Sequence, residues 1–119
     1  MSDEEDIKKF AEKYIKALQK GDADWFLENA DLYGMWERNK EQMGESYEET
    51  AEEFEKNYKS NLGLLKTKWK KKFSIKNVKI EGDKAEVEVD AEGAKSIGSP
   101  LILKKTDRWR YIMGAVWFW

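Results

Sequence analysis

The fold of this 119-residue chain follows from one stretch, Phe10-Ala-Glu-Lys-Tyr-Ile-Lys-Ala-Leu-Gln-Lys-Gly-Asp-Ala-Asp-Trp-Phe-Leu27. Its apolar residues recur at the i, i+3, i+4, i+7 spacing of a core-facing helix, a pattern that begins at Ile7. Gly21 can adopt the left-handed backbone conformation that ends a helix, and Asp22 can cap a short second helix. The buried side of that second helix is expected to comprise Trp25, Phe26 and Ala30. The stretch therefore predicts two helices joined by a glycine turn.

Further patterns extend the helical half of the chain. Ser2-Asp-Glu-Glu5 and Ser46-Tyr-Glu-Glu49 have the spacing of capping boxes, in which a hydroxyl and a carboxylate satisfy two backbone donors. The second box predicts a third helix to about Asn61, ended by Gly63. The apolar stripe of this helix is Ala51, Phe54, Tyr58 and Leu62. Asp31 to Lys40 fits no single period and contains Gly34, so we predict a loop with a short strand there.

From Leu65 onward the apolar period changes to two, which indicates strands. The first strand is expected at Phe73 to Ile80, extended back through Trp69 and Thr67, and Glu81-Gly-Asp-Lys84 forms a hairpin to the second. The second strand carries Ala85, Val87 and Val89. After a loop at Gly93 to Ser99, strands are expected at Pro100 to Thr106 and Trp109 to Phe118, joined by a turn at Asp107-Arg108. Three helices and a four-stranded antiparallel meander predict one α+β domain over residues 1–119, with helices on one face of a curved sheet.

Composition excludes several classes of function. The 22 Lys and Arg residues nearly balance the 24 Asp and Glu residues, for a formal charge of -2, whereas a general nucleic-acid binder has a basic excess. The absence of Cys and His removes disulfides, thiolate nucleophiles, Cys/His zinc sites and imidazole acid–base chemistry. We therefore predict no metal and no cofactor. No apolar run resembles a signal peptide or is long enough to span a bilayer as a helix, so we expect a soluble, cytoplasmic protein.

One basic run, Lys66-Thr-Lys-Trp-Lys-Lys-Lys72, contains an aromatic residue. Such a run can contact nucleic acid or an anionic membrane surface. It can equally be a solvated strand face whose lysines discourage edge-to-edge aggregation. Because the rest of the chain is acidic on balance, we favour the solvated face and predict neither a nucleic-acid nor a membrane partner.

Two stretches resemble the nuclear transport factor 2-like superfamily, which includes ketosteroid isomerases and polyketide-cyclase-like proteins. Tyr14-Ile-Lys-Ala-Leu-Gln-Lys-Gly-Asp-Ala-Asp24 is similar to the junction of the family's first two helices, and Asp107-Arg-Trp-Arg-Tyr-Ile112 resembles its last hairpin. The resemblance implies a cone-shaped fold with an internal pocket. It implies no particular activity, because the family spans isomerases, dehydratases, hydrolases, cyclases and transport adaptors.

Steroid-isomerase chemistry transfers poorly onto this chain. By the resemblance, Tyr14 falls where that enzyme keeps its oxyanion-hole tyrosine. Arg38, with Glu37 beside it, falls where a general-base aspartate is expected, and Ile102 replaces a protonated aspartate. Because ketosteroid isomerase needs both carboxyl groups, we do not transfer its activity.

The candidates for catalysis are Tyr14, Glu37 and Asp31. Tyr14 could donate to a carbonyl or a developing oxyanion, or it could pack its ring in the core and bond to a backbone group. Asp31 and Glu37 flank Tyr33-Gly-Met-Trp36. A carboxylate against a tryptophan in an apolar pocket would have a raised pKa and could act as a base. The alternative for both carboxylates is a helix cap or an exposed loop charge.

A set of aromatic residues could line a cavity for a flat apolar ligand or could be ordinary core. The set comprises Phe10, Tyr14, Trp36, Phe54, Tyr58, Trp69, Trp109 and Trp117. The residues that we expect to contact a ligand are Tyr14, Trp36, Phe54, Tyr58, Ile102 and Trp117.

The last predicted strand carries apolar side chains on both faces, whereas a half-buried strand alternates. If helices cover one face, a second subunit would cover the other, so we expect a homodimer through the sheet. The paired capping boxes, the single Pro and the surface rich in Lys and Glu are also typical of an idealised or computationally designed sequence. A thermophile protein could look similar.

Three functions stay open from the sequence. The first is a non-catalytic pocket for a small apolar or aromatic molecule, and an open cavity without carboxylates would favour it. The second is an acid–base isomerase or dehydratase that uses Tyr14 with Glu37 or Asp31, which requires a carboxylate of raised pKa inside the cavity. The third is a dimerisation scaffold with a filled core, which a cavity plugged by Trp36 and Trp117 would favour.

Overall fold

Helices fill the first half of the chain and strands the second, as the change of apolar period predicts. The computed structural model describes residues 3–62 and 71–119. The helices are α1 (Asp3–Lys20), α2 (Ala23–Asn29), α3 (Leu32–Met43), the 3-10 helix η1 (Gly44–Ser46) and α4 (Ala51–Leu62). The strands are β1 (Phe73–Glu81), β2 (Lys84–Ala91), β3 (Ser96–Ser99), β4 (Leu101–Lys105), β5 (Trp109–Met113) and β6 (Val116–Phe118). The predicted α+β class is confirmed, and none of the described helices is long and apolar enough to cross a membrane.

The first two helices follow the predicted pattern. Gly21 ends α1 with a φ of 68°, and the Asp22 carboxylate accepts the Trp25 N–H at 3.1 Å at the start of α2. The apolar stripe of α1 buries Ile7, Phe10, Ala11, Tyr14 and Leu18. Four expectations fall outside the described residues: the box at Ser2, the stop at Gly63, the strand extension through Thr67 and Trp69, and most of the basic run.

The prediction of a loop with a short strand after Asp31 is wrong, because this segment is helix α3. The Asp31 carboxylate caps the helix by accepting the Gly34 N–H at 3.0 Å. Gly34 does not break the helix but allows its close packing. A Cβ at this position would clash with the Asp31 carboxylate and lie 3.0 Å from Ile112 Cγ2 on β5. The described residues therefore contain four α-helices rather than three.

The capping box predicted at Ser46 is also wrong. Ser46 belongs to η1, and its hydroxyl donates to the Met43 carbonyl at 2.7 Å. Thr50 caps α4 instead: its hydroxyl accepts the Glu53 N–H at 3.2 Å and donates to the Glu53 carboxylate at 3.1 Å. Ser46 to Glu49 and Thr50 to Glu53 both have the residue spacing of a capping box. The Ser46 hydroxyl is bonded within the turn of η1, so only Thr50 is placed to cap α4.

The main sheet has the strand order β1-β2-β4-β5 and is antiparallel throughout. The predicted hairpin pairs Glu81 with Lys84, with Gly82 at a φ of 62°. A register shift in β1 between Ile75 and Asn77 moves the apolar phase by one residue. This shift explains why Phe73 and Ile75 are followed by Val78 and Ile80 in a single strand.

The chain departs from the predicted meander after β2. Ser96–Ser99, expected as a loop, is strand β3, and the predicted last strand is two strands interrupted at Gly114-Ala115. β6 leaves the main sheet and pairs with β3. The interruption releases the Ala115 N–H from sheet pairing, and this N–H donates to the Tyr14 hydroxyl instead.

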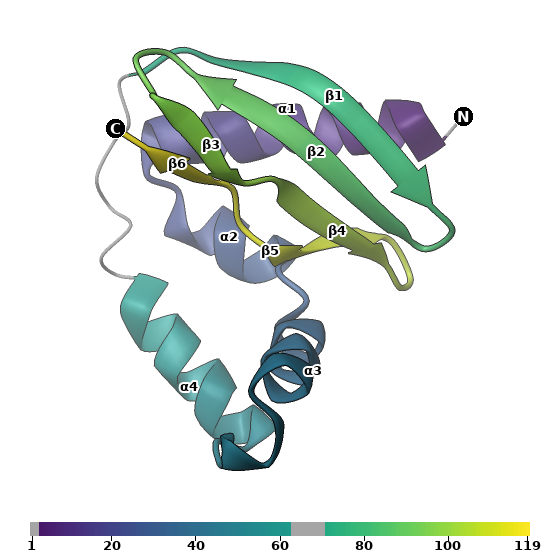
Figure 1. The fold of residues 1–119 in the computed structure, drawn as a ribbon, viewed down its shortest axis with the longest axis vertical. Coiled ribbons are helices and arrows are strands. Elements are labelled where there is room, and N and C mark those ends of the chain that lie inside the picture. Colours follow the sequence, from purple (N-terminus) through teal and green to yellow (C-terminus); the bar gives the residue numbers. More distant parts are fainter. Residues whose placement is uncertain (1–2, 63–70) are drawn as a thin grey trace.

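The elements enclose a core between α1 and the main sheet, while α3 and α4 form a V that extends away from the sheet with η1 at its tip (Figure 1). The largest fully buried side chains of this core are Ile7, Leu101, Leu103, Val87 and Val89. Close packing of these side chains fixes how α1 lies on the sheet.

The apolar residues on both faces of β5 are covered within the chain. The Tyr111 ring lies 5.8 Å from that of Tyr14, and Ile112 packs against α3 beside Gly34. A second subunit is therefore not needed to explain them. On β6, in contrast, Val116 is 43% exposed and Phe118 is 60% exposed.

Candidate functional site

A cavity of about 350 Å³ lies where the described helices meet the break between β5 and β6. Its wall includes Tyr14 of α1, Tyr58 of α4 and Tyr111 of β5, and we call it the tyrosine cavity. The rest of the wall is largely apolar and includes Leu18, Phe26, Met35, Ile112 and Trp117. No Asp, Glu, Lys or Arg among the described residues lines it. The volume and the few polar groups are those of a small-molecule site.

Two of the three hydroxyls form a chain that ends on the backbone. Tyr111 Oη donates to the Phe26 carbonyl at 3.0 Å, and Tyr58 Oη lies 2.5 Å from Tyr111 Oη. Because Tyr111 gives its only proton to the carbonyl, Tyr58 must be the donor to Tyr111. These two hydrogen bonds connect α4, β5 and α2 around the cavity.

Tyr14 is arranged differently. Its Oη accepts the Ala115 N–H at 3.2 Å, a donor that the break between β5 and β6 makes available. Among residues 3–62 and 71–119, the Tyr14 hydroxyl proton has no acceptor. The rings of Phe26 and Tyr111 hold the Tyr14 ring edge-on at 5.3 and 5.8 Å. As far as the described residues show, the cavity therefore contains one fixed hydroxyl with a proton to donate.

Burial keeps the three hydroxyls protonated. It raises the pKa of Tyr14 to about 12, although the hydrogen bond from Ala115 opposes the shift. Burial also raises the pKa of Tyr58 and of Tyr111, and the neighbouring tyrosines add to the effect on Tyr111. Near neutral pH the hydroxyls are thus neutral donors and acceptors, which can hold an oxygen of a ligand but do not remove its proton.

Three of the residues predicted to contact a ligand line this cavity: Tyr14, Tyr58 and Trp117. Trp117 belongs to the wall and is fixed by its Nε1–H, which donates to the Val89 carbonyl at 2.8 Å. Phe54 stacks on Tyr58, with ring centroids 6.1 Å apart, and does not line the cavity. Ile102 lies in a small surface pocket beside Arg38 and Glu86.

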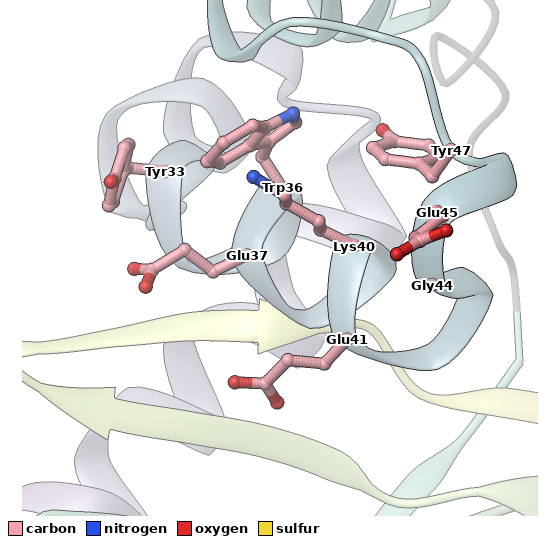
Figure 2. A pocket seen from close by; sticks show the side chains of 8 residues that line it. All are labelled: Tyr33, Trp36, Glu37, Lys40, Glu41, Gly44, Glu45 and Tyr47. Carbon is pink, nitrogen blue, oxygen red and sulfur yellow. The ribbon is translucent and has the colours of Figure 1, made fainter.

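The other predicted residues lie away from the tyrosine cavity. Asp31 caps α3, and Trp36 and Glu37 lie in a groove formed by α3 and η1 (Figure 2). The Trp36 Nε1–H donates to the Glu49 carbonyl at 2.7 Å. The structure therefore brings neither Asp31 nor Glu37 into the cavity with Tyr14.

Tyr111 is the one of the three cavity tyrosines that sequence reasoning did not identify. Its hydroxyl binds a carbonyl 85 residues earlier in the chain, so no local pattern could reveal the contact. A weak signal existed, because a tyrosine in an otherwise apolar strand needs a partner for its hydroxyl.

Neither a metal nor a relative helps to identify the site. Within the described parts of the chain, no group of three or more Asp and Glu side chains is placed to hold a metal ion. Comparisons with protein-family models, with curated proteins and with solved structures find no match for this chain.

Proposed function

We propose that the chain binds a small apolar or aromatic molecule in the tyrosine cavity and does not catalyse its conversion. The observation that carries the proposal is an apolar cavity in which Tyr14 has a hydroxyl proton without an acceptor among the described residues. The matching ligand is a flat apolar molecule with one carbonyl, ether or hydroxyl oxygen. Its oxygen would accept from Tyr14 while its rings contact Phe26 and Trp117.

The composition of the cavity favours this function over the two alternatives. An acid–base enzyme needs a group that exchanges protons near neutral pH, whereas no carboxylate of the described residues lines the cavity and the pKa of Tyr14 is raised to about 12. A filled scaffold would leave no space, whereas Trp36 lies elsewhere and Trp117 forms a wall of an open cavity.

We also propose that the fold is a divergent form of the nuclear transport factor 2-like cone. Support comes from the two resembling stretches and from the order of the elements, in which helices precede an antiparallel sheet. A homodimer stays a proposal too, supported by the exposed Val116 and Phe118 on β6. Light scattering across protein concentrations would test it.

The binding proposal is tested by calorimetric titration with 2-naphthol, a steroid-like ketone and naphthalene, which lacks the oxygen. Tyr14→Phe should weaken binding of the two oxygen-bearing ligands about fivefold to tenfold, the effect of one neutral hydrogen bond, and leave naphthalene unaffected. Tyr33→Phe is the matched control, because Tyr33 is 60% exposed and lies outside the cavity. Absence of saturable binding to all three ligands, or equal losses in both variants, would overturn the proposal.

A further inference from the structure

A second hollow, of about 700 Å³, is lined by residues of α3 and η1 and by Tyr47. We call it the α3 groove. Figure 2 shows its aromatic side chains, Tyr33, Trp36 and Tyr47, together with the acidic side chains of Glu37, Glu41 and Glu45. Lys40 is the only basic residue in its wall among the described residues. The groove thus combines exposed and half-buried rings with an excess of negative charge.

The central ring of the groove is held in place. The Trp36 Nε1–H donates to the Glu49 carbonyl at 2.7 Å, so the indole cannot turn without losing this bond. The Tyr33 ring lies 5.5 Å from the Trp36 ring at an interplanar angle of 41°, and Tyr33 is 60% exposed. At the other end, Tyr47 is half-buried, and its hydroxyl has no hydrogen-bond partner among the described residues. A ligand would therefore meet preformed aromatic faces.

A cation already occupies one face of Trp36. Lys40 Nζ lies 5.1 Å from the centre of the Trp36 ring, within the range of a cation–π contact. Lys40 is an exposed side chain one helical turn after Trp36, so it can move aside. The contact shows that this face of the Trp36 ring can bind a cation.

The charged side chains of the groove also favour a cationic ligand. Among the described residues, none of Glu37, Glu41 and Glu45 forms an ion pair. Within the described part of the groove wall, three carboxylates against one ammonium give an excess of negative charge beside the rings, which favours a cation over a neutral or anionic ligand. A primary ammonium keeps its water shell, whereas a quaternary ammonium is weakly hydrated, has no N–H to satisfy and fits aromatic faces.

We infer that the α3 groove is a second binding site, which takes a small quaternary ammonium ion of the choline type. Its cation lies on the face of Trp36 and displaces Lys40, while the three glutamates supply diffuse negative charge. The site is independent of the tyrosine cavity, so Tyr14→Phe leaves it unchanged.

The test is a titration with choline at constant ionic strength, followed by the NMR signal of the Trp36 indole N–H and by broadening of the choline methyl signal. The matched neutral ligand is 3,3-dimethylbutan-1-ol, which has the shape of choline without the charge. Choline should give a saturable shift, and the alcohol should bind at least about tenfold more weakly. Phosphocholine should also bind more weakly than choline, because its phosphate is repelled by the glutamates. Equal binding of all three ligands would overturn the inference.

Variants separate this site from a general aromatic surface. Trp36→Leu should abolish choline binding, and Lys40→Met should strengthen it about twofold to fivefold by removing the competing cation. Trp119→Leu is the matched control, because Lys71 Nζ lies 4.2 Å from the Trp119 ring, in a similar cation–π contact outside the groove. If Trp36→Leu does not fold, choline binding is measured with Glu41→Gln and Lys40→Met instead. Glu41→Gln should weaken the binding of choline, because it removes one of the negative charges. Weaker binding by Lys40→Met, or a loss in Trp119→Leu, would overturn the inference.

Discussion

The tyrosine cavity and the α3 groove use the same kinds of side chain in opposite ways. In the cavity the rings of Tyr14 and Tyr111 are packed edge to face, and the tyrosine hydroxyls lie on backbone groups or on one another. No charged residue is present among the described wall residues. In the groove Tyr33 and Trp36 present their faces beside three carboxylates and a lysine. The neighbours of an aromatic residue, more than its type, thus decide whether it offers a hydrogen bond to a neutral ligand or a ring face to a cation.

The comparison predicts that alkaline pH acts mainly through the cavity. Below pH 10, Tyr14 is protonated in the folded and the unfolded chain. Between pH 10 and 12 it ionises when unfolded but stays protonated when folded, because its pKa is raised from 10.0 to about 12. The free energy of unfolding should therefore fall, by roughly 3 kcal/mol for Tyr14 alone, as pH rises through this window. Tyr58 and Tyr111 add to the loss, since burial raises their pKa as well.

Urea unfolding followed by circular dichroism between pH 8 and pH 12 measures this loss. Tyr14→Phe is the control and should show a shallower decline with pH than the parent protein. An identical decline in both proteins would mean that Tyr14 is accessible to water in the folded state.

The second prediction compares one tyrosine from each region. Tyr111→Phe removes the donor to the Phe26 carbonyl and the acceptor for Tyr58, so two partly or fully buried groups lose their partner. We expect a loss of about 2–3 kcal/mol in the free energy of unfolding. Tyr33→Phe in the groove should change it by less than about 0.5 kcal/mol, because Tyr33 is largely exposed. Chemical denaturation of both variants gives the difference, and equal losses would contradict the contrast.

The two regions were not equally accessible from the sequence. Tyr14, Tyr58 and Trp117 could be assigned to a cavity because helical and strand periodicity places them on faces that point inward. The strand break was missed, because the apolar run continues through Gly114-Ala115 and does not show that β6 pairs with β3. The hydrogen bonds of Tyr111 to Tyr58 and Phe26 were also missed, because these partners are distant in the sequence.

The third prediction concerns that strand break. A Cβ at Gly114 would lie 2.9 Å from the Tyr14 hydroxyl oxygen, closer than packing allows. Gly114→Ala should therefore cost about 1–2 kcal/mol of unfolding free energy through overpacking. In the Tyr14→Phe background the same substitution should cost less, because the hydroxyl that it meets is gone. A double-mutant cycle measured by denaturation gives the coupling, and a coupling of zero would show that the clash is relieved elsewhere.

The groove was missed for a local reason. Gly34 and the mixed apolar pattern obscured α3, although Asp31 three residues before Gly34 is itself a start signal. Without α3, Trp36 was assigned to a ligand cavity and Glu37 to an apolar pocket, whereas both lie on α3 in the groove. The error in one element thus displaced two of the candidate site residues.

The smallest expected effect lies beside the groove, where local caps rather than buried contacts hold the backbone. Thr50 and Ser46 both match a capping signature, but only the Thr50 hydroxyl accepts a backbone N–H at the start of α4. Thr50→Ala should lower the free energy of unfolding by about 1 kcal/mol. Ser46→Ala should lower it by less than about 0.5 kcal/mol, because the bond from its exposed hydroxyl to the Met43 carbonyl is readily replaced by water. Thermal denaturation of the pair decides which hydroxyl starts the helix, and a larger loss for Ser46→Ala would restore the capping box predicted from the sequence.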